Sequence, residues 1–206
     1  PETEIQIIAG STGGLYAQIV HGAPFDIFLA ADADRPRRLL EEHKALQVFH
    51  YATGRLVFWA PDTAAQVTES TLRSTKRPIA VANHKTAPYG AAAKQVLTAL
   101  NIHDKEFITG SNVSQSYQFV DSGNVETGFV ALSQVTNRID RKEWWIVPPQ
   151  FFEPIVQLGA LLPDHHIDTS IFLEFFLSET TQKKISANGY QDLRDSKAPL
   201  HSEHMN

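Results

Sequence analysis

The chain has 206 residues, of which 42% are apolar, enough to fill the core of one large domain or of two small lobes. Its formal net charge is −5 and no run of lysine or arginine stands out, which argues against nucleic acid or an anionic membrane surface as a partner. The longest apolar stretches, residues 56–60 and 171–177, are far shorter than the ~20 residues that cross a bilayer. The absence of cysteine excludes disulfides, thiolate metal sites and a thiol nucleophile.

Strand-like apolar runs alternate along the chain with amphipathic segments of helical length. The expected strands cover residues 5–8, 26–30, 56–59, 78–82, 128–132 and 144–147. The expected helices cover residues 14–21, 34–43, 90–101, 113–122, 132–138, 168–178 and 180–188, the last ending at Asn188-Gly189. This alternation predicts an α/β fold of mostly parallel strands buried on both faces. The polar stretch 191–206 is expected to be frayed or disordered.

Three turns share one design, in which small or hydroxyl-bearing residues stand directly before a helix. They are GSTGG at 10–14, APYG at 87–90 and GSNVS at 110–114. Pro88 suits a first helical position, and Ser111 or Asn112 suits an N-cap. A helix N-terminus presents unpaired N–H groups and about half a positive charge, so each turn is a potential anion site. A single such turn is often only a helix cap, and it is the combination of three that points to anion binding.

Several runs of sequence, in a fixed order, carry a family resemblance. They are GSTGGLYAQI at 10–19, GAPFDIFLAAD at 22–32, GRLVFW at 54–59, IAVAN at 79–83, APYGAA at 87–92, NVSQ at 112–115, SGN at 122–124 and GFVALSQ at 128–134. Together they cover about residues 4–192 and resemble the periplasmic molybdate-binding proteins of ABC transporters.

The resemblance implies the type II periplasmic-binding-protein fold, in which two α/β lobes are joined by two crossover strands and close over the ligand. Residues 79–83 would form the first crossover and residues 144–149 the return. One lobe is then discontinuous, 1–82 with 150–206, and the other spans 83–149. The family holds its oxyanion with hydroxyls and main-chain N–H groups from turns of this kind, which implicates Ser11, Thr12, Tyr89 and Val113.

The resemblance also implies a non-catalytic, monomeric periplasmic protein that captures molybdate or tungstate without a cofactor and delivers it to a membrane permease. Molybdate carries two charges and no proton near neutral pH, so a site made of donors alone can hold it. Protonated phosphate would bring a donor that such a site leaves unpaired, at a cost of about 1–3 kcal/mol. The size of the site must therefore separate molybdate from sulfate.

Family members begin with a strand, a donor-bearing turn and a helix before the strand that matches residues 4–9, and this sequence lacks them. The absent strand would lie between the strands at 4–9 and 26–31. Two outcomes would satisfy the backbone groups it leaves behind. Residues 4–9 can shift to pair directly with 26–31, which we favour because it needs no partner, or another chain can donate a strand and form an oligomer. No ligand role is assigned to Ala131, where some family members place a tyrosine.

Other chemistries find less support in the sequence. The histidines at 165–166 and at 201 and 204 lie in a loop and in the tail, and are expected at the surface, because a metal site needs three or four fixed ligands. A Gly-x-Ser-x-Gly nucleophile elbow does not occur, and no lysine follows the glycines at 10–14 as it would in a P-loop. An enzyme is thus the least supported class. The alternative to a transport protein is a regulatory or vestigial module of the same fold that has lost oxyanion binding.

Overall fold

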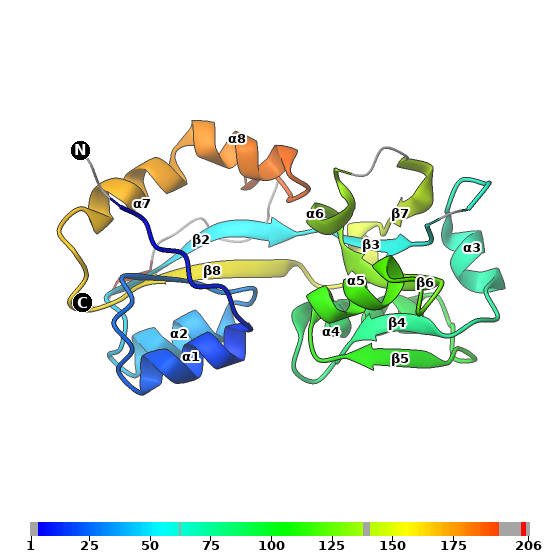
Figure 1. Ribbon diagram of the computed structural model, residues 1–206, viewed down its shortest axis with the longest axis horizontal. Helices are drawn as coiled ribbons and strands as arrows, with labels where there is room; N and C mark the ends of the chain where they lie inside the picture. Colours follow the sequence, from blue (N-terminus) through cyan, green and yellow to red (C-terminus); the bar gives the residue numbers. More distant parts are fainter. Residues whose placement is uncertain (1–3, 62, 138–140, 194–202, 205–206) are drawn as a thin grey trace. The chain divides into compact units, whose positions relative to one another are not determined.

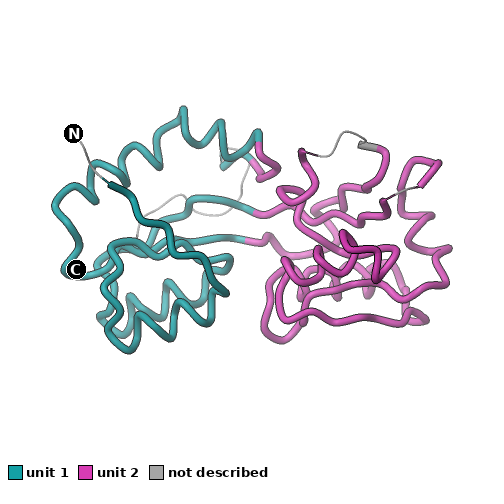
Figure 2. The backbone as a smooth tube through the Cα atoms, in the orientation of Figure 1, with its two compact units in different colours: residues 1–53, 156–187, 192–206 teal, residues 54–155, 188–191 magenta. Residues whose placement is uncertain are grey.

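The computed structural model describes residues 4–61, 63–137, 141–193 and 203–204 (Figure 1). The chain forms two compact units (Figure 2). Unit 1 comprises residues 1–53, 156–187 and 192–206, and unit 2 comprises residues 54–155 and 188–191. The chain therefore passes between the units at residues 53–54 and 155–156, and crosses again on either side of the short segment 188–191.

Unit 1 is a four-stranded sheet with helices on both faces. Its elements are α1 (Thr12–Val20), β1 (Ile27–Leu29), α2 (Asp34–Glu41), β2 (Gln47–Gly54), β8 (Ile155–Leu161), α7 (Thr169–Leu177), α8 (Glu179–Ala187) and β9 (Glu203–His204). The strand order is β1-β8-β2-β9, and β1 runs antiparallel to β8. Helices α1 and α2 cover one face over a core that includes Phe28, Leu39 and Val48. Helix α7 lies on the other face (Figure 1), where Phe176 contacts Tyr51 at 5.7 Å between ring centroids.

Unit 2 is built on a five-stranded sheet in the order β5-β4-β6-β3-β7. Its elements are β3 (Leu56–Trp59), α3 (Glu69–Ser74), β4 (Ile79–Ala82), α4 (Pro88–Ala99), β5 (Phe107–Gly110), α5 (Val113–Asp121), β6 (Thr127–Ala131), α6 (Leu132–Val135), η1 (Arg141–Glu143), β7 (Trp144–Ile146) and η2 (Pro149–Phe151). Helix α4 packs through Ala92 and Val96 on one face of the sheet, and α5 packs through Val120 on the other. Burial on both faces explains why β3, β4 and β6 are continuous apolar runs in the sequence.

The α/β class is confirmed, but the sheets are mixed rather than mostly parallel. Parallel pairing joins β4 to β5 and to β6, whereas β3 runs antiparallel to β6 and to β7. A parallel pair requires a crossover connection of a dozen or more residues. Helix α4 supplies that crossover between β4 and β5, and α5 supplies the connection from β5 to β6.

The predicted lobe boundaries differ from the compact units. The prediction places residues 54–82 and 150–155 in the first lobe, which it gives as 1–82 with 150–206. In the structure these residues belong to unit 2, together with 83–149. The predicted first crossover, 79–83, contains β4, which pairs with β5 and β6 inside the unit 2 sheet. The predicted return, 144–149, contains β7, which pairs with β3 in the same sheet. The connections lie instead at the ends of β2 and β8.

Residues 4–9 do not form the predicted strand. They have no regular secondary structure and are exposed, with 58% of Ile5, 83% of Ile7 and 48% of Ile8 accessible. The expected pairing of 4–9 with 26–31 is therefore wrong, because β1 pairs with β8 and with no other described strand. Of the stretch 191–206, predicted to be frayed or disordered, residues 203–204 form β9 and pair with β2, whereas residues 194–202 and 205–206 lie outside the described residues.

Candidate functional site

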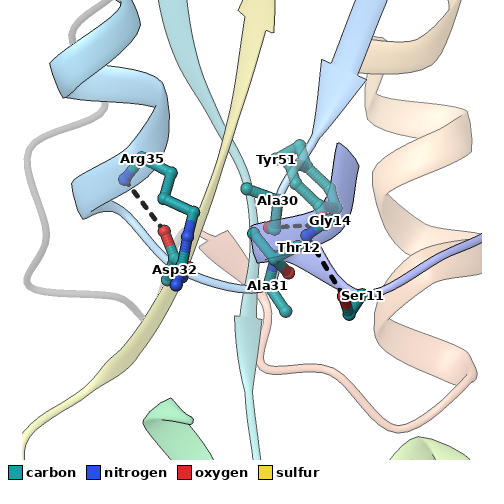
Figure 3. A network of polar contacts seen from close by, with 8 residues as sticks. All are labelled: Ser11, Thr12, Gly14, Ala30, Ala31, Asp32, Arg35 and Tyr51. Carbon is teal, nitrogen blue, oxygen red and sulfur yellow. Dashed lines mark hydrogen bonds and ion pairs between the residues drawn. The ribbon is translucent and has the colours of Figure 1, made fainter. Parts of the chain in front are cut away.

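Two hydroxyl-bearing residues, Ser11 and Thr12, stand at the start of α1 (Figure 3). Ser11 is the N-cap of α1, and its Oγ accepts a hydrogen bond from the N–H of Gly14 at 3.1 Å. Thr12 Oγ1 accepts from the N–H of Ala31, in the segment after β1, at 3.3 Å. A hydroxyl that accepts one bond still has a proton to donate. Both side chains therefore remain able to donate to an anion at the start of α1.

The segment that follows β1 is fixed by polar contacts to the same turn and its surroundings (Figure 3). Tyr51 Oη donates to the carbonyl oxygen of Ala30 at 3.0 Å. The carboxylate of Asp32 is buried, accepts from the backbone N–H of Arg35 at 3.0 Å and pairs with the Arg35 guanidinium. That guanidinium lies beside Gly13, since a Cβ built on Gly13 would be 3.5 Å from an Arg35 Nη atom. The sequence reasoning found neither Asp32 nor Arg35, because nothing in a lone Asp-x-x-Arg spacing marks a site.

In unit 2 two helices begin at the same edge of the sheet. Strands β4 and β5 are parallel, with Ala82 opposite Gly110, and each is followed by a turn and a helix. The backbone N–H of Asn83 donates to the carbonyl oxygen of Gly110 at 2.8 Å, which joins the two turns. Open α/β sheets bind ligands outside the carboxyl ends of their parallel strands. The starts of α4 and α5 therefore lie where this fold class places a ligand.

Tyr89 is the second residue of α4, after Pro88 at the first position as predicted. The residue is only 4% exposed and belongs to the apolar core of unit 2. The N-cap position, Ala87, offers no side chain that could accept a bond from the first turn of α4. A contribution of Tyr89 to anion binding would therefore come from its main-chain N–H and not from its phenol.

Val113 is the first residue of α5, directly after the predicted N-cap Asn112. Asn112 Oδ1 accepts from the N–H of Gln115 at 2.9 Å, and Gln115 Oε1 accepts from the N–H of Ser111 at 2.6 Å. The valine side chain packs against the apolar core. Its backbone N–H has no partner among the residues that the structure describes. Val113 is thus a main-chain donor at a well-capped helix start.

The four predicted residues fall into two pairs. Ser11 and Thr12 adjoin at the start of α1 in unit 1, and Tyr89 and Val113 lie at one sheet edge in unit 2. Each pair is formed within its own unit, and convergence of the two pairs on one ligand stays a prediction.

Two histidines belong to elements other than those that carry the candidate donors. His50, in β2, is buried, and burial lowers its pKa, although a hydrogen bond from its Nε2 to the carbonyl of Ala52 at 2.9 Å acts in the opposite direction. His166 is exposed in the loop before α7, and its Nδ1 lies 3.7 Å from Oδ2 of Asp168. Within the described ranges no group of three metal-ligating side chains occurs. His201, expected at the surface, lies outside the described residues. Nor does any described helix have the length and hydropathy of a membrane span.

Comparison with known proteins shows where the chain belongs. The sequence profile of the bacterial extracellular solute-binding proteins matches residues 1–191. The chain is a member of that family. It is 37% identical to the molybdate-binding protein ModA of Rhodobacter capsulatus over 88% of this chain and 75% of that protein. It is 40% identical to ModA of Azotobacter vinelandii over 74% of this chain, a match that spans 64% of the relative.

A solved structure supports the same assignment. The periplasmic molybdate-binding protein of Azotobacter vinelandii superimposes with a TM-score of 0.78 at 33% identity, over 88% of this chain and 84% of that one. The resemblance inferred from the sequence runs is therefore confirmed, and so is the periplasmic-binding-protein fold. These relatives are binding proteins.

Proposed function

We propose that this protein captures a tetrahedral oxyanion, molybdate or tungstate, outside the cytoplasm and delivers it to the permease of an ABC importer. The observation that carries the proposal is the pair of helix starts, α4 and α5, at one edge of the parallel part of the unit 2 sheet. Relatives named as molybdate-binding proteins, at 37% and 40% identity, supply the choice of anion. We expect the protein to act as a monomer, without a cofactor and without catalysis.

The donors suit an anion that carries no proton. Ser11 and Thr12 offer hydroxyl protons, and Val113 offers a main-chain N–H at a helix N-terminus, where the partial positive charge of the helix adds to its attraction. Each charge-assisted hydrogen bond contributes roughly 1.5–3 kcal/mol. Four or five such bonds would account for the ~8–12 kcal/mol of micromolar to nanomolar binding.

The cation beside the start of α1 belongs to an ion pair. Arg35 lies beside Gly13 at the start of α1, but its guanidinium is paired with the buried carboxylate of Asp32. The ion pair has no net charge, so we expect discrimination between anions to rest on donor geometry. Protonated phosphate is disfavoured because no carboxylate is proposed to accept its proton.

Calorimetric titration of the protein with molybdate, tungstate, sulfate and phosphate at pH 7.5 tests the proposal. Saturable one-to-one binding of molybdate and tungstate, at least about tenfold tighter than of sulfate or phosphate, is the expected result. Absence of binding to all four anions would favour the regulatory or vestigial alternative. Preference for sulfate would retain the transport class but overturn the choice of anion.

A further inference from the structure

Gly54 stands where a side chain has no room. It is the last residue of β2 and the first of unit 2, and it is buried. A Cβ at this position would lie 2.2 Å from Tyr89 Oη, 2.8 Å from Tyr89 Cζ and 3.2 Å from Ile155 Cγ2. Its φ lies outside the left-handed region, so space and not backbone conformation requires glycine here. The phenol of Tyr89 occupies the volume that a larger residue would take.

The main chain next to Tyr89 is also tightly packed, at Gly90. A Cβ on Gly90 would lie 2.3 Å from the carbonyl oxygen of Ala82, so the first turn of α4 rests backbone to backbone against the end of β4. The helix start cannot move closer to that strand. The ring is enclosed by the unit 2 core, with Leu56 and Ile155 in the same cluster. A displaced ring therefore finds no free space, and the main chain at residue 89 must take up part of the shift.

We infer that Gly54 is a positioning residue for oxyanion binding. By leaving room for the Tyr89 ring it fixes the start of α4, and with it the direction of the main-chain N–H groups there. The inference rests on the proposed function, in which Tyr89 donates from its main chain. Gly54 itself makes no contact with the anion. Gly54 and Ile155 are the first and last residues of the main segment of unit 2, and Tyr89 belongs to the same core cluster as Ile155.

Calorimetric titration of the Gly54→Ala variant with molybdate tests the inference. We expect the Kd to rise roughly tenfold or more, since a methyl group added to a packed site displaces its neighbours. The double variant Gly54→Ala/Tyr89→Phe lacks the hydroxyl nearest to the new methyl group and is expected to recover part of the affinity.

Gly159→Ala is the matched control. Gly159 is a buried glycine of β8 in unit 1, and a Cβ there would lie 2.3 Å from Cζ of Phe49. The steric conflict is as severe as at Gly54, but it involves no proposed donor. This variant is expected to lose thermal stability and to keep its affinity for molybdate. An equal loss of affinity in Gly54→Ala and Gly159→Ala would mean that destabilisation alone explains the effect, and would overturn the inference.

Amide resonances measured by NMR without ligand give a second, independent readout. The amide signals of residues 89–91 are expected to move in Gly54→Ala, to return toward their original positions in the double variant, and to stay in place in Gly159→Ala. Unmoved signals together with a Kd within about twofold of the original would also overturn the inference. If the unmodified protein does not bind molybdate, the proposed function fails, whereas the amide signals still decide whether Gly54 positions the start of α4.

Discussion

The two units provide their candidate donors in different ways. In unit 2, Tyr89 and Val113 follow parallel strands that are buried on both faces, and their side chains point into the core. The donor in each case is the peptide N–H, which the fold positions and which most substitutions leave intact. In unit 1, Ser11 and Thr12 follow an exposed segment without secondary structure, and their donors include side-chain hydroxyls. Hydroxyl donors are lost by a single substitution, so the two units should respond to mutation differently.

Thr12→Ala is expected to have the largest effect of the substitutions at the four donors. It removes a hydroxyl donor and leaves the N–H of Ala31 without its acceptor. The loss of one charge-assisted bond corresponds to roughly 1–3 kcal/mol, on the order of ten- to hundredfold in Kd. Calorimetry with molybdate measures it, and Thr12→Ser, which keeps a hydroxyl, is the control. Equal affinity in Thr12→Ala and the unmodified protein would remove Thr12 from the site.

Val113 allows the corresponding test in unit 2, with a somewhat smaller effect. Val113→Pro deletes the N–H, yet proline is well tolerated at the first position of a helix, and the preceding Asn112 already has the extended conformation that proline favours. We expect about a tenfold rise in Kd for molybdate. Val113→Ala keeps the N–H and should change the Kd by less than about threefold. If alanine weakens binding as much as proline, the valine side chain and not the peptide group is what matters.

The contrast between the units also explains how far the sequence could predict the fold. Strands β3, β4 and β6 are buried on both faces, and their unbroken apolar runs identified them. The start of α4 was recognisable from Pro88 and that of α5 from Asn112. Strand β2 was missed because it contains His50, Thr53 and Gly54, polar or small residues that interrupt the apolar pattern. The short strand β5 was missed because three of its four residues are exposed.

Other features depend on contacts between distant residues and leave no local signal. Residues 4–9 have a strand-like sequence but no partner among the described strands, and a strand forms only where a neighbour completes its hydrogen bonds. The fit of the Tyr89 ring over Gly54 joins positions 35 residues apart along the chain. Arg35 reaches Gly13 only because α1 and α2 pack on the same face of the unit 1 sheet.

The unfolding free energy of the protein should depend on pH because of His50 in unit 1. Burial lowers the pKa of His50 below its ordinary value of 6.5, so the folded protein binds a proton there less readily than the unfolded chain. The unfolding free energy is then highest above pH 6.5 and declines as the pH falls through 6.5 toward the lowered pKa. Urea denaturation at pH 7.5, 6.5 and 5.5 measures the decline. His50→Gln should flatten it, and an unchanged profile in that variant would assign the dependence to other groups.

Binding, in contrast, should hardly depend on pH. The proposed donors are hydroxyls and amides, which do not titrate between about pH 6 and 8, and molybdate keeps its charge there. Repeating the molybdate titration across this range is expected to give Kd values within about twofold. A steep loss of affinity that follows the protonation of an imidazole would show that a histidine belongs to the site.

The central prediction is that the candidate donors of both units bind the same anion. An NMR titration of the 15N-labelled protein with molybdate tests it directly, because the amide signals of Thr12, Tyr89 and Val113 report on each unit separately. All three signals are predicted to move and to saturate together, with a single Kd that agrees with calorimetry. Movement confined to the signals of one unit, or two different Kd values for the two units, would contradict the claim.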